Sequence, residues 1–137
     1  FACTQWFNLP AGQDTLGVEH LRGKIIVLTL WAGFDFLGPS RHRAEELNAT
    51  HSIYADTGDV AFVGIHDSTV PPEHVLAAVR ELGLSFPVGC DQAPYETFAR
   101  YLTQQIPQTV LIDKRGLVRF YATEGRLVEL IKVLRRE

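Results

Sequence analysis

The sequence predicts one α/β domain with a mixed central sheet and helices on both faces. Two near-continuous β-branched and apolar runs, Lys24–Trp31 and Val60–His66, have the pattern of strands that are covered on both faces. Ser40–Tyr54, which lies between them, has apolar residues at helical spacing. Strand, helix and strand in this order predict a parallel pair joined by a right-handed crossover.

The middle of the chain predicts a second crossover. Pro72 favours the start of a helix with an apolar stripe, and Gly83 stands at the position that commonly follows a helix end. Phe86–Cys90 is then predicted as a short strand. Because a proline inside a strand lacks an N–H group, Pro87 predicts that this strand lies at a sheet edge.

The last third of the chain predicts an antiparallel arrangement. Pro94–Leu102 is predicted as a helix, and Gln108–Asp113 and Leu117–Tyr121 as two strands joined by a tight turn. Leu127–Leu134 carries the apolar stripe of a final helix. We therefore expect Lys24–Trp31 at the centre of the sheet, between the second apolar run, parallel to it, and Gln108–Asp113, antiparallel to it.

Length and composition limit the class of protein. The 137 residues fit one domain over 1–137, which we expect to be part of a longer or processed protein, and the 46% hydrophobic content excludes global disorder. The net charge of −3 gives no reason to expect a nucleic-acid partner, and Arg41-His42-Arg43 is interpreted as part of a solvated face. No apolar run approaches the ~20 residues that span a bilayer. Two cysteines, Cys3 and Cys90, are too few for a disulfide scaffold.

Four motifs, in the right order along the chain, resemble the TlpA/ResA and redoxin (AhpC/TSA-like) branch of the thioredoxin-like superfamily. They are the entry strand Leu21–Ala32, the segment Ile106–Gly116, the N-terminal Trp6–Pro10, and Phe86-Pro87-Val88 followed by Asp91. The resemblance implies a thioredoxin-like fold with an N-terminal hairpin and an α-β insertion. It also implies a bacterial, extracytoplasmic protein.

The chain departs from this family where the family's chemistry takes place. After the Trp-Ala pair the family has an aromatic residue and then Cys-Gly-Pro-Cys; here Phe36 matches the aromatic residue and Leu37-Gly38-Pro39-Ser40 follows it. Leu37 cannot ionise or form a mixed disulfide, and Ser40 has no evident base to activate it. A peroxiredoxin alignment places Gly38 at the thiol position, and Thr29 stands where thioredoxins have a buried Asp. The loss of these groups therefore predicts a degenerate, redox-inactive domain rather than an enzyme.

Pro107 matches the family's cis-proline, which faces the active-site loop. The residue before that proline offers its backbone to an extended peptide, so we expect a cis Ile106–Pro107 bond and binding of a peptide or protein partner there. The alternative is that the cis bond is part of a purely structural domain. The expected apolar rim of this groove comprises Phe34, Phe36, Leu37, Gly38, Pro39, Ile106 and Pro107.

A residual thiol enzyme is the alternative from another class. Cys90 and His66 end neighbouring predicted strands, so a thiol-disulfide oxidoreductase or peroxidase using Cys90 is conceivable. Asp67 and Asp91 follow them, which raises a metal site as a further alternative, but no spacing typical of metal sites is present. The interpretation that we favour is a small buried cysteine beside an exposed histidine, with no metal and no cofactor. A Cys3–Cys90 disulfide stays open.

Overall fold

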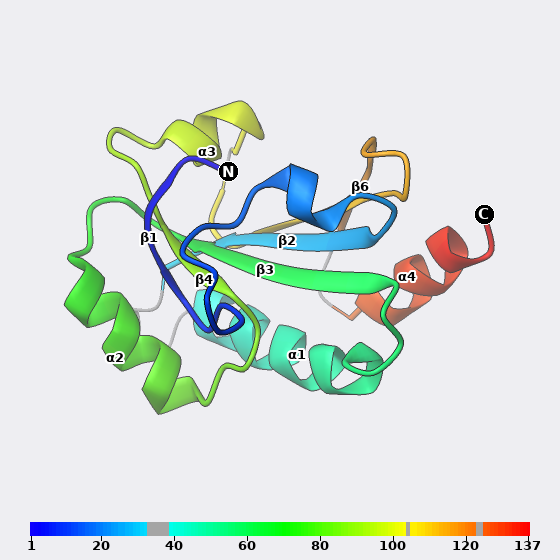
Figure 1. Cartoon of the computed structure of the whole chain (residues 1–137), viewed down its shortest axis with the longest axis horizontal. Helices are drawn as coiled ribbons and strands as arrows, with labels where there is room; N and C mark the ends of the chain where they lie inside the picture. The colour runs from blue at the N-terminus through cyan, green and yellow to red at the C-terminus, as the bar shows by residue number, and fades with distance from the viewer. Residues whose placement is uncertain (33–38, 104, 123–124) are drawn as a thin grey trace.

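The computed structural model describes residues 1–32, 39–103, 105–122 and 125–137. In these residues six strands form one sheet in the order β1-β4-β3-β2-β5-β6 (Figure 1). The strands are β1 Cys3–Phe7, β2 Ile25–Trp31, β3 Val60–His66, β4 Val88–Asp91, β5 Gln108–Ile112 and β6 Val118–Ala122. The helices are the 3-10 helix η1 Val18–Leu21 and the α-helices α1 Pro39–Tyr54, α2 Pro72–Leu82, α3 Glu96–Arg100 and α4 Leu127–Arg135.

Strand β2 lies at the centre of the sheet, as the sequence predicts. It pairs in parallel with β3, from Ile25 opposite Val60 to Trp31 opposite His66. On its other side it pairs antiparallel with β5, where Ile26 faces Ile112. Every residue of β2 is buried, which is the reason for its near-continuous apolar run, with Thr29 as the polar exception.

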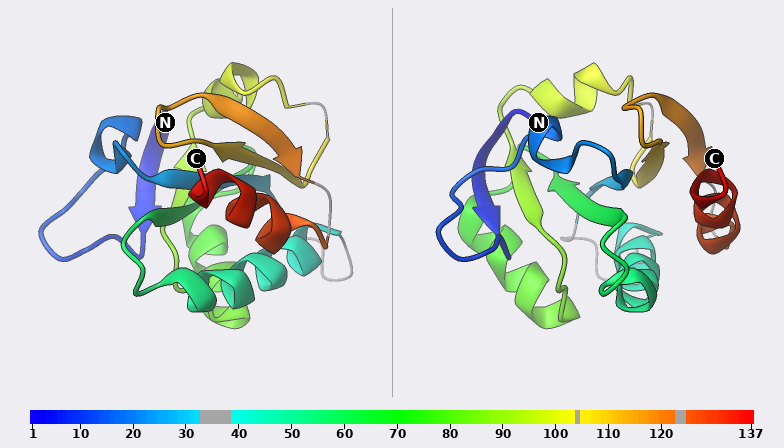
Figure 2. Two further views of the ribbon diagram at one scale, coloured as in Figure 1. Left: turned by 90° about the vertical axis from the view of Figure 1, so that its right-hand side faces the viewer. Right: turned by 45° about the vertical axis from the view of Figure 1, so that its right-hand side comes forward.

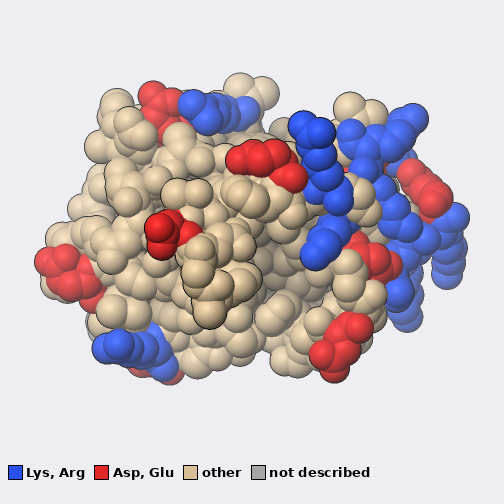
Figure 3. Space-filling view, viewed as in Figure 1, with Lys and Arg blue, Asp and Glu red and all other residues tan. Residues whose placement is uncertain are grey.

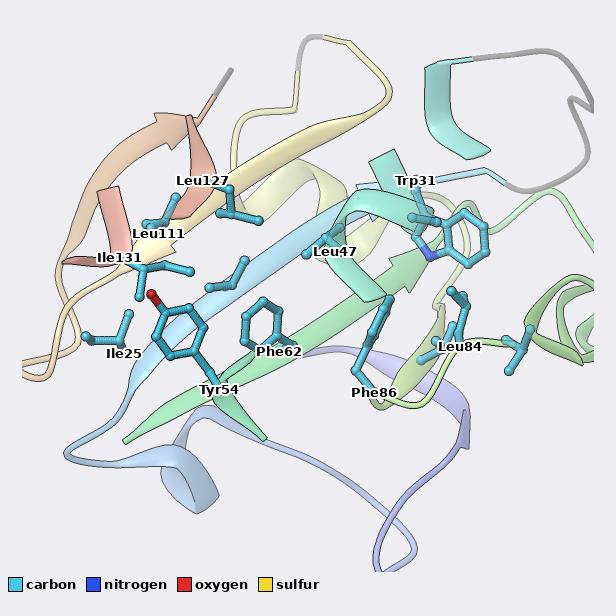
Figure 4. Close-up of a cluster of buried hydrophobic side chains, with 14 of the residues drawn as sticks. Ile25, Trp31, Leu47, Tyr54, Phe62, Leu84, Phe86, Leu111, Leu127 and Ile131 are labelled. Atoms are coloured by element: carbon cyan, nitrogen blue, oxygen red, sulfur yellow. The ribbon is translucent and has the colours of Figure 1, made fainter. Parts of the chain in front are cut away.

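The two faces of the sheet carry separate apolar clusters, because side chains alternate along a strand. Helices α1, α2 and α4 cover one face, and α3 and η1 lie on the other (Figures 1 and 2). In β2, Ile25, Val27 and Trp31 join the first cluster and Ile26, Leu28 and Leu30 the second. Figure 4 shows side chains of the first cluster, including Leu47 of α1, packed between the sheet and its helices.

Helix α2 has the ends that the sequence predicts. It starts after Pro71 and is followed by Gly83, whose φ of 62° is the left-handed conformation that glycine adopts without strain. None of the described helices is long and apolar enough to cross a membrane.

The predictions for β4 and for the N-terminal segment are wrong in one respect each. Strand β4 is not an edge strand, because β1 pairs with it antiparallel. Pro87 precedes the strand, so no ladder N–H is lost, and its carbonyl accepts a hydrogen bond from Gly64 N at 2.9 Å. The N-terminal segment forms this one strand rather than a hairpin of its own. The pairing is close, since a Cβ added at Gly89 would lie 2.7 Å from Cys3 Sγ.

Helix α3 is shorter than the predicted Pro94–Leu102. Tyr95 has a left-handed backbone conformation, with φ 71°, and regular helix begins only at Glu96. The peptide bond Ala93–Pro94 is cis, a feature that the sequence analysis did not predict.

Candidate functional site

Three neighbouring strands end together and bring Trp31, His66 and Cys90 into one row. Trp31 faces His66 in the β2–β3 ladder, and His66 faces Cys90 in the β3–β4 ladder. The Trp31 and His66 rings meet edge to face with centroids 4.9 Å apart. These are carboxyl ends of parallel strands, the edge at which α/β proteins commonly bind ligands. The register thus confirms that His66 and Cys90 lie side by side.

His66 is buried, not exposed as the sequence analysis expects. Only 1% of the residue is accessible, because the Trp31 ring packs against it. Its Nδ1 lies 3.2 Å from the carbonyl oxygen of Asp67. Burial lowers the pKa of His66, and the neighbouring Asp67 opposes this only in part. The ring is therefore neutral near pH 7 and supplies no positive charge to Cys90.

The Cys90 thiol lies inside the apolar cluster beneath α1 and α2. The residue is 3% exposed, and burial raises the pKa of its thiol to about 11. At neutral pH roughly one thiol in 10⁴ is then ionised. Because the thiolate is the nucleophile, Cys90 in this structure is poorly suited to attack a disulfide or a peroxide.

The second thiol, Cys3, lies on the opposite face of the sheet. Cys3 packs with the α3-side cluster, whereas Cys90 belongs to the α1-side cluster. Burial, and then the charge of Asp91, raise the pKa of Cys3 to about 12. In the β1–β4 ladder Cys3 faces Asp91, and Gln5 faces Cys90. Both cysteines are free, and the disulfide left open by the sequence does not form in this register.

The carboxylates of Asp67 and Asp91 have structural roles. Asp67 Oδ1 accepts hydrogen bonds from the backbone N–H and the hydroxyl of Thr69, at 2.7 and 2.6 Å. Asp91 Oδ1 accepts from the N–H of Thr97 at 2.7 Å, and its Oδ2 from Phe98 N at 3.2 Å, which fixes the start of α3. Over the described part of the chain no three His, Cys, Asp or Glu residues are grouped to hold a metal. The metal alternative gains no support from these carboxylates.

The cis-proline segment is the accessible part of this edge. The Ile106–Pro107 bond is cis, Ile106 is 40% exposed, and Pro107 immediately precedes β5. Within the described residues, the backbone of Ile106 makes no hydrogen bond. A cavity of about 590 Å³ adjoins it; the lining residues are Pro94, Tyr95, Phe98, Ala99, Thr103, Gln105 and Ile106. Thr103 Oγ1 is buried there without a hydrogen-bond partner.

Most of the other residues predicted for the apolar rim of the groove lie outside the part of the chain that the structure describes. Phe34, Phe36, Leu37 and Gly38 lie outside the described residues. Pro39 and Ser40 are the first two residues of α1. The cavity beside Ile106 instead draws on Tyr95 and Phe98 of the α3 region, which the sequence analysis did not connect with the groove.

Arg43 is the residue near this edge that the sequence analysis misinterpreted. Its side chain is only 11% exposed, and it donates to Thr109 Oγ1 at 2.8 Å and to the Ala122 carbonyl at 3.3 Å. Thr109 Oγ1 in turn shares a 2.8 Å hydrogen bond with Thr29. The charge is partly balanced by Glu46, 3.6 Å from Arg43 Nε. Spacing could have revealed it, because Arg43 precedes the buried Leu47 by one helical turn.

Comparison with known proteins identifies the family. The model of the AhpC/TSA family matches residues 3–121. The chain belongs to the AhpC/TSA family. Proteins of curated function show no significant match to it.

Solved structures of similar fold cover nearly the whole chain. The chain is 27% identical to the thioredoxin-like superfamily protein SPOA0173, covering 99% of this chain and 94% of that one, with a TM-score of 0.80. It is 23% identical to a thiol-disulfide isomerase from Corynebacterium glutamicum, with the same coverage and a TM-score of 0.82. It is 22% identical to a thiol-disulfide oxidoreductase from Bacteroides fragilis, covering 96% and 99%, with a TM-score of 0.76. The fold is therefore thioredoxin-like.

This AhpC/TSA domain combines thiols of raised pKa with an accessible proline segment. Cys90 is buried and Cys3 half-buried, and the raised pKa of each thiol keeps it protonated at neutral pH. Among the described residues, Ile106 and the cavity beside it are open to a ligand at this edge. Such an arrangement is suited to non-covalent binding of a chain segment.

Proposed function

We propose that this domain binds an extended peptide segment of a partner protein along Ile106–Pro107, without catalysing thiol chemistry. The observation that carries the proposal is the state of the two thiols. Cys90 is buried and Cys3 half-buried, both thiols have a raised pKa, and they lie on opposite faces of the sheet. A dithiol mechanism needs a reactive thiolate and a second thiol within bonding reach.

The binding half of the proposal rests on Ile106. Its backbone N–H and C=O groups, which form no hydrogen bond with the described residues, suit pairing with an extended strand of a partner. The adjoining cavity of about 590 Å³ has apolar and aromatic walls, which suits an apolar side chain of that peptide. Main-chain pairing would supply affinity, and the cavity would supply selectivity.

The test combines an activity assay with peptide selection. Insulin reduction with dithiothreitol is expected to proceed no faster with the domain than without it. Peptides selected from a random display library are expected to bind Ile106→Asp at least about tenfold more weakly than the unmodified domain. Ile53→Asp is the matched control, because Ile53 is a 63% exposed isoleucine of α1 outside this cavity. Equal binding to Ile106→Asp, or a failure to select any peptide, would refute the peptide-binding proposal.

A thiol-disulfide oxidoreductase or peroxidase-type enzyme that uses Cys90 is a second candidate. The specific observation in its favour is the register that sets Cys90 beside His66. Membership of the AhpC/TSA family favours it as well. Because both groups are buried, this candidate requires the edge to open during turnover.

Cysteine variants separate the two candidates. Reductase or peroxidase turnover that disappears in Cys90→Ser but persists in Cys3→Ser would establish the enzyme. The absence of turnover together with Ile106-dependent peptide binding would establish the binding domain. Absence of both would leave a structural module.

A further inference from the structure

A second cavity lies at the opposite end of the sheet from Ile106. It has a volume of about 420 Å³ and forms where the segment before β2 meets the turn after β5. Figure 1 shows the loop that leads into β2 beside the β5–β6 hairpin. The lining residues are Val18, Leu21, Arg22, Gly23, Lys24, Ile26, Asp113, Lys114, Arg115 and Gly116. This cavity shares no residue with the proline cavity.

Four of the lining residues are cationic. Arg22 and Lys24 come from the segment before β2, and Lys114 and Arg115 from the turn after β5. The antiparallel register, in which Ile26 faces Ile112, brings these two segments together. Figure 3 shows Lys and Arg side chains gathered at the right-hand end of the molecule, although the chain as a whole carries a net charge of −3.

The one acidic lining residue, Asp113, does not neutralise this charge. Its carboxylate accepts hydrogen bonds from Arg115 N at 2.9 Å and Leu117 N at 3.0 Å. Its other oxygen pairs with Arg119 Nη1 at 3.2 Å, and its side chain is only 6% exposed. Asp113 is therefore committed to the hairpin turn and to Arg119, which lies outside the lining.

The cationic side chains lack carboxylate partners of their own. Among the described residues, no ion pair is formed by Arg22, Lys24, Lys114 or Arg115. The Arg115 backbone N–H donates to Asp113, but among the described residues the Arg115 guanidinium forms no ion pair with Asp113 or Glu137, although its charge acts on both carboxylates. Like charges held together around a hollow with apolar walls repel one another, and a bound anion would relieve that repulsion.

The shape of the cavity indicates more than a bare ion. Val18, Leu21 and Ile26 form an apolar wall beside the cations. A volume of about 420 Å³ lies in the range of small-molecule sites and exceeds what one inorganic phosphate fills. Arginine can bind a phosphate with two parallel hydrogen bonds, and lysine acts as a point charge on it.

We propose that the cavity between Arg22–Lys24 and Lys114–Arg115 binds an organic phosphate, with the phosphate group on the cations and the organic part against Val18, Leu21 and Ile26. The phosphate group can belong to a small soluble molecule or to a lipid headgroup. The site is independent of the peptide groove, because it lies at the amino end of β2 and the groove at the carboxyl end.

Titration calorimetry with phenyl phosphate tests the proposal on the whole chain. Phenyl phosphate is expected to bind more tightly than inorganic phosphate or phenol alone, and its affinity is expected to fall with added salt. The double variant Lys24→Gln, Lys114→Gln is expected to weaken binding at least about tenfold. Lys24→Arg, which keeps the charge, is expected to retain binding. The matched control is Lys132→Gln, since Lys132 is an exposed lysine of α4 outside the lining.

A second measurement distinguishes the source of the phosphate. Phosphatidylcholine vesicles with and without phosphatidic acid are sedimented with the domain. Binding of phosphatidic-acid vesicles that depends on Lys24 and Lys114, without binding of phenyl phosphate, identifies a lipid headgroup. The proposal is overturned if neither probe binds, or if Lys132→Gln weakens binding as much as the double variant. Circular dichroism verifies that each variant is folded.

Discussion

Two groups of polar side chains flank the end of β2, and they are stabilised in different ways. On the β3–β4 side, Trp31, His66 and Cys90 are buried and neutral, and Trp31 Nε1 has no hydrogen-bond partner among the described residues. On the β5 side, Thr109, a backbone carbonyl and Glu46 surround the Arg43 guanidinium. One side has become part of the apolar core, whereas the other has kept a hydrogen-bonded charge next to the proline segment. The β5 side is therefore better suited to binding at Ile106 than the β3–β4 side is to thiol chemistry at Cys90.

The largest effect is expected from removing the charge on the β5 side. Arg43→Met should lower the free energy of unfolding by about 2–3 kcal/mol, because it removes charged hydrogen bonds to Thr109 Oγ1 and to the Ala122 carbonyl. Arg43→Lys should lose less, since it keeps the charge. Urea denaturation measures both variants. A loss below about 0.5 kcal/mol for Arg43→Met would mean that the two sides do not differ in this way.

The Cys90 thiol should make stability depend on pH in the alkaline range. Because its pKa is raised from 9.0 to about 11, the stabilisation is complete below pH 9 and is lost as the pH rises toward 11. The free energy of unfolding should fall by up to about 2 kcal/mol more in the unmodified domain than in Cys90→Ala over this window. Cys3 is expected to leave a residual slope in the variant, since its pKa is also raised. Identical slopes would show that Cys90 is accessible.

The buried imidazole of His66 should make the free energy of unfolding depend on pH in the acidic range, where stability falls as the pH falls. The pKa of His66 is lowered from 6.5, so its stabilisation is present above pH 6.5 and is lost as the pH falls below that value. His66→Gln should reduce this loss. His51→Gln serves as a comparison, because burial also lowers the pKa of His51, which lies on α1 away from the row. If stability falls equally with decreasing pH in His66→Gln and in the unmodified domain, a group other than His66 is responsible for the loss.

The smallest effect is expected at Thr103. Its hydroxyl oxygen is buried without a partner, so Thr103→Val should change the free energy of unfolding by less than about 0.5 kcal/mol or stabilise the domain slightly. Thermal denaturation is sufficient to measure this. A clear destabilisation would show that Thr103 forms a hydrogen bond in solution, as the residues around Arg43 do.

Local patterns in the sequence were sufficient for most of the fold. The near-continuous apolar run of β2 predicted its central position, and Gly83 predicted the end of α2, because each depends on the residues themselves and their neighbours. Pairing between strands that are far apart in the sequence was harder to predict. The residues of Phe86–Cys90 do not indicate that β1, at the start of the chain, pairs with this strand. Pro87 alone therefore predicts an edge strand, which is wrong.

The candidate site was predicted in part, for similar reasons. Strand ends placed His66 beside Cys90 correctly, and the proline motif indicated the cis bond at Ile106–Pro107. Exposure of His66 was predicted wrongly, because the ring that buries it comes from a neighbouring strand. The burial of Arg43 depends on partners in β5 and β6, far away in the sequence.

The pairing of β1 with β4 also has a consequence for association between molecules. Strand β4 is short and buried along its whole length, and without β1 its N–H and C=O groups would form an open, apolar edge. Such edges recruit strands from other molecules and start aggregation. Five residues near one end of the chain therefore act as a protective cover for the sheet. Their close fit over Gly89 means that a larger residue there would loosen the cover and favour self-association.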